Sequence, residues 1–128
     1  MAESIYLFID ANAPLEQIVD HIASITELQF HKYALAGETF QARTPYSIIT
    51  IFGDHGFEND RDMHFEDYQY TMEICAIRVL RMAANQDQTE QFASRLFEQL
   101  KATERYALLL VGDLQQKHQE HRPRSHAV

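Results

Sequence analysis

The clearest pattern in the chain is a strict alternation of apolar and polar residues in the segment YQYTMEICA, residues 68–76. The even positions are apolar, and the positions between them from 67 to 73 are polar, namely Asp67, Gln69, Thr71 and Glu73. A period of two over this length is typical of a β-strand with one face on a core and the other in water. We therefore predict a strand here, with one face buried.

Other stretches are also typical of strands. The segments SIYLFID and YALLLV are apolar at successive positions, which favours strands buried on both faces. The segment YSIITIF is rich in β-branched and aromatic residues, which also favours a strand. The predicted strands span residues 4–10, 28–33, 46–52 and 106–111, with a brief pairing segment at 40–43.

Two stretches have the spacing of amphipathic helices. The first follows Asn12-Ala-Pro14 and the second follows Asp87, which forms a capping box with Glu90. Their apolar stripes are Leu15, Ile18, Val19, Ile22 and Ile25, and then Phe92, Ala93, Leu96, Phe97 and Leu100. We interpret residues 82–88, MAANQDQ, as a polar connection and expect a loop there.

The element order β-α-β-β-β-α-β predicts an α+β domain. We expect a mixed, mostly antiparallel sheet of about five strands, with both helices packed on one face. The strands at 46–52 and 66–79 should pair antiparallel, and the strands at 5–10 and 106–111 should be central neighbours. The fold should occupy residues 1–113, since residues 114–128 are almost devoid of apolar side chains and predict a polar, disordered tail.

Length and composition narrow the class of protein. The chain has 128 residues, enough for one hydrophobic core. The single cysteine, Cys75, cannot form an internal disulfide and fits a reducing compartment. The chain shows neither a signal-peptide pattern nor an apolar run of the ~20 residues that span a bilayer. We expect a cytoplasmic protein.

Charge is concentrated in one segment. The formal net charge is −8, which argues against partners such as nucleic acid or anionic membranes, because both attract Lys and Arg. The segment 54–67 contains one base, Arg61, against six acids, namely Asp54, Glu58, Asp60, Asp62, Glu66 and Asp67. A charged run of this kind is either a solvated connection or a surface that attracts a basic partner.

Aromatic residues lie among these acids. Phe57 and Phe65 can supply the apolar contacts that a charged surface lacks, or they can hold the loop against the core. Both interpretations stay open on the sequence alone. The candidate partner-binding residues are Asp54, Glu58, Asp60, Asp62, Glu66, Asp67, Phe57 and Phe65.

A metal site is not expected in this segment. Glu58, Asp60 and Asp62 alternate as at the start of a calcium-binding loop, but Met63 stands where that loop needs glycine and Gln69 where it needs glutamate. Two histidines nine positions apart, His55 and His64, are a weak signal for a transition metal. We predict neither a metal nor a cofactor.

Catalytic motifs are also missing from the sequence. It has no Gly-rich phosphate loop, no G-x-S-x-G and no H-E-x-x-H. Asp10 and Asp113 follow the first and last predicted strands, and they would meet at one sheet edge if those strands were parallel neighbours. Turn chemistry is the favoured explanation for both residues, because Asp is common where strands end.

These observations favour a non-enzymatic domain that binds another protein. The leading hypothesis is an immunity or inhibitor type of protein that neutralises a basic toxin or nuclease domain through its acidic surface. The alternative is a small enzyme or ligand-binding domain with a carboxylate site, which can hold a divalent metal, at the sheet edge. A third hypothesis is a homodimer formed through exposed strand edges.

Overall fold

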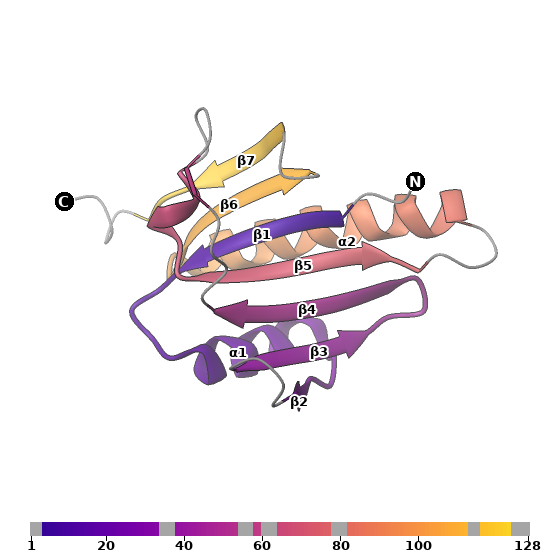
Figure 1. Cartoon of the computed structure of the whole chain (residues 1–128), viewed down its shortest axis with the longest axis horizontal. Helices are drawn as coiled ribbons and strands as arrows, with labels where there is room; N and C mark the ends of the chain where they lie inside the picture. The colour runs from indigo at the N-terminus through magenta and orange to yellow at the C-terminus, as the bar shows by residue number, and fades with distance from the viewer. Residues whose placement is uncertain are drawn as a thin grey trace.

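The computed structural model describes residues 4–33, 38–53, 58–59, 64–77, 82–112 and 116–123. These residues form one sheet, two α-helices and one short 3₁₀ helix (Figure 1). In chain order the elements are β1 (Ser4–Asp10), α1 (Leu15–Thr26), β2 (His31–Tyr33), β3 (Thr39–Arg43), β4 (Ser47–Gly53), η1 (Phe65–Asp67), β5 (Tyr70–Ala76), α2 (Met82–Thr103), β6 (Ala107–Gly112) and β7 (Gln116–His121). The predicted α+β class is confirmed.

The sheet has seven strands in the order β2-β3-β4-β5-β1-β6-β7, and every neighbouring pair is antiparallel. The expected pairing of β4 with β5 and the central position of β1 beside β6 are confirmed. The expected count of about five strands was too low, and the sheet is antiparallel throughout. Strands β1, β4, β5 and β6 with the two helices form two interlocked split β-α-β units, the ferredoxin-like order of elements.

The alternation in β5 corresponds to the two faces of the sheet. Met72 and Ile74 are fully buried in the core on the helix side. Glu73 points to the other face, where it accepts a hydrogen bond of 3.0 Å from the hydroxyl of Tyr6. The alternation predicts that Thr71 faces water. It is instead buried on that second face, beside its β1 partner Phe8.

Both helices pack on the same face of the sheet, as predicted (Figure 1). Helix α1 packs against β4, and α2 packs against β5, β1 and β6. The predicted stripe residues form the main core together with the inward side chains of the central strands. From the helices this core contains Leu15, Ile18, Val19, Ile22, Phe92, Ala93, Leu96, Phe97 and Leu100.

Helix α2 begins at Met82, so the predictions of a loop at 82–88 and of a cap at Asp87 were wrong. The extra turns are anchored by polar contacts that hydrophobic periodicity cannot reveal. The Asn85 side-chain amide donates to the carbonyl oxygen of Ile77 at 3.0 Å. Thr89 is fully buried, with its hydroxyl 2.6 Å from that of Ser47.

Strand β7 lies within the stretch that was predicted to be a disordered tail, and that prediction was wrong for residues 116–121. The strand pairs antiparallel with β6, with a register irregularity between Leu110 and Val111. Backbone hydrogen bonds to β6 hold β7 in the sheet, although β7 has no apolar residues. Pairing of this kind leaves no hydrophobic pattern in the sequence.

Neither described helix has the length and apolar character needed to cross a membrane.

Candidate protein-binding surface

A second apolar cluster lies on the sheet face opposite the helices, and η1 forms part of it. The cluster contains Phe8, Phe65, Tyr68, Ala107, Leu109 and Val111. Phe65 is only 3% exposed, and its ring centroid lies 4.7 Å from that of Phe8. The structure therefore supports the interpretation in which Phe65 packs against the core. We remove Phe65 from the candidate partner-binding residues.

Tyr68 anchors the other end of η1. It is 2% exposed, and its hydroxyl donates a hydrogen bond of 3.0 Å to the Glu120 carboxylate in β7. Burial, and then the charge of Glu120, raise the pKa of the Tyr68 hydroxyl well above its usual range. The Arg122 guanidinium lies 5.7 Å from the centroid of the Tyr68 ring. The end of β7 is thus attached to η1 by several contacts.

The acids of this segment that the structure describes are exposed. We call Glu58, Glu66 and Asp67 the acidic surface. Its backbone is held by a reciprocal pair of hydrogen bonds: the Asn59 amide donates to Glu66 Oε2 at 3.1 Å, and the Glu66 amide donates to Asn59 Oδ1 at 2.9 Å. The carboxylates therefore stand on an ordered scaffold.

Asp67 of the acidic surface has a cationic neighbour among the described residues, Arg122. Asp67 Oδ2 lies 3.3 Å from a guanidinium nitrogen of Arg122, and both side chains are about half exposed. Exposed pairs of this kind contribute about 0–1 kcal/mol. The Asp67–Arg122 pair is therefore easily exchanged for a contact with another cation.

The remaining candidate residues, Asp54, Phe57, Asp60 and Asp62, lie outside the described residues, as does His55. His64 is exposed just before η1. Among the described residues no group of three or more His, Cys, Asp or Glu side chains is placed to hold a metal ion.

Asp10 and Asp113 would meet at one sheet edge only if the strands before them, β1 and β6, were parallel neighbours. The two strands are neighbours, but they run antiparallel. Asp10 pairs with Ala107 at the start of β6, whereas Gly112, the residue before Asp113, pairs with Ile5 at the opposite end. Asp113 itself lies outside the described residues. The condition under which the two acids would meet is therefore not fulfilled.

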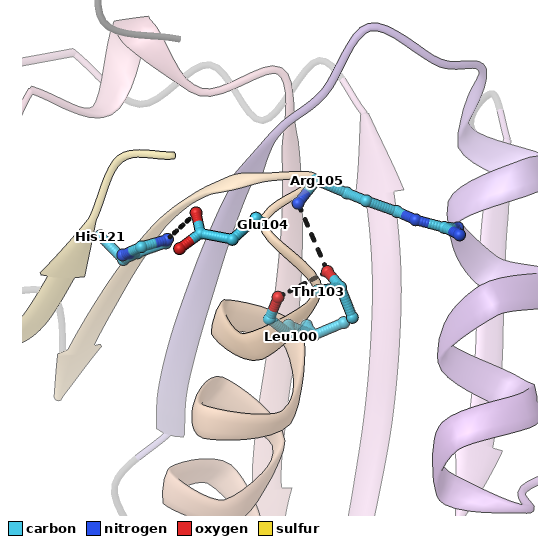
Figure 2. Close-up of polar contacts among 5 residues, drawn as sticks. All are labelled: Leu100, Thr103, Glu104, Arg105 and His121. Atoms are coloured by element: carbon cyan, nitrogen blue, oxygen red, sulfur yellow. Dashed lines mark hydrogen bonds and ion pairs between the residues drawn. The ribbon is translucent and has the colours of Figure 1, made fainter. Parts of the chain in front are cut away.

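Sequence reasoning missed two further acids that make side-chain contacts at the end of β7, Glu104 and Glu120. Figure 2 shows the Glu104 carboxylate directed at His121 Nε2, 3.2 Å away. Glu104 follows α2 in a left-handed conformation with φ of 56°, and Thr103 caps the same turn by donating 2.7 Å to the Leu100 carbonyl oxygen. Glu104 contacts His121, 17 positions away, and Glu120 contacts Tyr68, 52 positions away, so both contacts depend on the tertiary fold.

A polar pair also connects helix α1 with the residue before β6. His21 Nδ1 and the Tyr106 hydroxyl are hydrogen-bonded, linking α1 to the start of β6. Burial lowers the pKa of His21, and the nearby Arg105 charge lowers it further. Burial also raises the pKa of Tyr106. In Figure 2 the Arg105 side chain extends away from Glu104 toward α1. The pair links two core elements.

Comparison with known proteins gives no family assignment: no family model matches the chain, and neither a curated protein nor a solved structure matches it significantly.

Proposed function

We propose that this chain is a non-enzymatic protein-binding domain whose acidic surface binds a basic partner. The partner class that best fits is a cationic toxin or nuclease domain, which the chain would inhibit in the cytoplasm in the manner of an immunity protein. One observation supports this most: Glu58 and the η1 acids, Glu66 and Asp67, are exposed, while Phe65 and Tyr68 in the same segment are buried.

The anchoring matters because a binding surface loses less entropy on association when it is already ordered. Phe65 and Tyr68 fix η1 to the sheet, and two hydrogen bonds tie Asn59 to Glu66 in η1. An ordered group of carboxylates on a chain of net charge −8 attracts a cationic protein over long range and speeds its association.

The Asp67–Arg122 contact is compatible with this proposal. A partner arginine or lysine can take the place of Arg122 at a cost of about 0–1 kcal/mol, because the pair is exposed. The acids Asp54, Asp60 and Asp62, with Phe57, remain part of the proposal on the grounds of their sequence position. Phe57 would supply the apolar contact that Phe65 cannot.

The proposal is tested by affinity capture with two variants of equal net charge. The surface variant is Glu58→Gln/Glu66→Gln/Asp67→Asn. The helix variant neutralises three exposed acids on the two helices, Asp20→Asn/Glu90→Gln/Glu98→Gln. We expect the immobilised wild type and the helix variant to retain one basic protein from the source cells, in a salt-sensitive manner, and the surface variant to lose it. Equal retention by both variants contradicts the proposal.

A further inference from the structure

A hollow of about 300 Å³ lies on the helix side of the sheet, between the end of α1, the β3–β4 turn and the middle of α2. Ile25, Leu28, Tyr46 and Phe92 provide apolar lining. Its volume is at the lower limit for ligand pockets. It belongs to the opposite face of the sheet from the acidic surface, so it is a separate site.

The polar residues around this hollow divide into two groups. Thr26 donates to the Ile22 carbonyl oxygen at 2.8 Å, and Thr44 accepts the Ser47 amide at 2.8 Å. Arg95 and Gln99 line the same hollow but make no hydrogen bond or ion pair with any part of the chain that the structure describes. The hollow therefore has an apolar lining and two donors that are free to bind a ligand.

The two donors lie side by side. Arg95 and Gln99 are four residues apart on α2, which places them one turn apart on the same helix face. A guanidinium group binds a carboxylate through two parallel N–H bonds, and a glutamine amide can donate a third. Together they match one planar carboxylate.

The surroundings of Arg95 disfavour a ligand with more than one negative charge. Asp87, Glu90 and Glu98 line the outer surface of α2 beside Arg95, and the chain as a whole carries −8. These acids repel a multiply charged anion such as a phosphate ester more strongly than a monoanion. We therefore propose that the hollow binds a small monocarboxylic acid with an apolar body, its carboxylate on Arg95 and Gln99 and its body against Leu28 and Phe92.

The test uses 3-phenylpropionate, with 3-phenylpropan-1-ol as its uncharged counterpart, in NMR titrations of the full chain. We expect saturable amide shifts around Ile25, Leu28 and Phe92 for the acid. Arg95→Gln should weaken binding of the acid about fivefold, the upper range for an exposed ion pair, and leave the alcohol unaffected. The control Lys101→Gln removes an equal charge from the last turn of α2 and should change the dissociation constant less than about twofold.

Three results would overturn this assignment. The first is shifts that do not saturate or that map away from the hollow. The second is an unchanged affinity for the acid in Arg95→Gln. The third is an equal loss in Arg95→Gln and Lys101→Gln, which would show a general charge effect. None of these results bears on the acidic surface.

Discussion

Phe65→Ala removes the side chain that holds η1 against the sheet. The Phe65 ring is 3% exposed and packs at 4.7 Å, centroid to centroid, on the ring of Phe8. Truncation to alanine leaves a cavity between η1 and the strands beneath it. The folded state loses both the transfer free energy of the ring and its contact with Phe8.

The magnitude follows from the place of Phe65 in the fold. Buried Phe→Ala substitutions lower the free energy of unfolding by about 3–5 kcal/mol. Because η1 is a short element on one face of the sheet and can relax inward, we expect a loss near the lower limit, about 3 kcal/mol. With a urea dependence of roughly 2 kcal/mol per molar, the unfolding midpoint falls by about 1.5 M.

The assay is urea unfolding followed by circular dichroism, with Tyr33→Ala as the matched control. Tyr33 lies on the edge strand β2 and is 44% exposed, so its truncation should lower the free energy of unfolding by less than about 1 kcal/mol. If Phe65→Ala and Tyr33→Ala shift the midpoint equally, then Phe65 is not part of the core and η1 is not anchored as described.

Three further predictions concern other parts of the fold. Thr89→Val leaves the fully buried Ser47 hydroxyl without its hydrogen-bond partner and should lower the free energy of unfolding by about 1–3 kcal/mol. The measurement is urea unfolding, and a loss below about 0.5 kcal/mol would contradict a buried hydrogen bond between Thr89 and Ser47. Because the pKa of His21 is lowered from 6.5 in the folded chain, the unfolded chain takes up that proton first, and stability should fall as the pH drops below 6.5. His21→Gln should reduce this fall in thermal melts, and an unchanged pH profile would show that His21 contributes nothing to it. Glu27 has a φ of 61° at the end of α1, a left-handed conformation that glycine adopts without strain. Glu27→Gly should therefore raise the free energy of unfolding by about 0.5–1 kcal/mol. An equal gain from Glu27→Ala would show that the gain does not come from this backbone conformation.

The central strands could be predicted because burial leaves a pattern in their sequences, an alternation in β5 and an unbroken apolar run in β1 and β6. In β5 the core accepts Met72 and Ile74 while Glu73 points to the other face, and this alternation is visible in the sequence. The first turns of α2 and the whole of β7 could not be predicted in this way. They are held by polar contacts, such as that of Asn85 with the Ile77 carbonyl, and by backbone pairing with β6.

The candidate site was predicted only in part. A cluster of acids in the sequence indicates a charged surface, and Glu58, Glu66 and Asp67 are indeed exposed. The role of Phe65 depended on whether a second apolar cluster covers the face opposite the helices. The contact of Asp67 with Arg122 joins residues 55 positions apart, so it depends on the strand order. Strand order is a long-range property that local patterns do not contain.

The proposed role of the acidic surface is tested most directly by the association rate constant between the chain and the basic protein that we expect the affinity capture to retain. Stopped-flow measurements at low salt should compare the surface variant with the helix variant, since each loses three of the acids that contribute to the net charge of −8. We predict that the surface variant associates about tenfold or more slowly than the wild type and that the helix variant stays within about twofold of it. Equal slowing of both variants would mean that net charge alone drives the encounter, which would contradict the account.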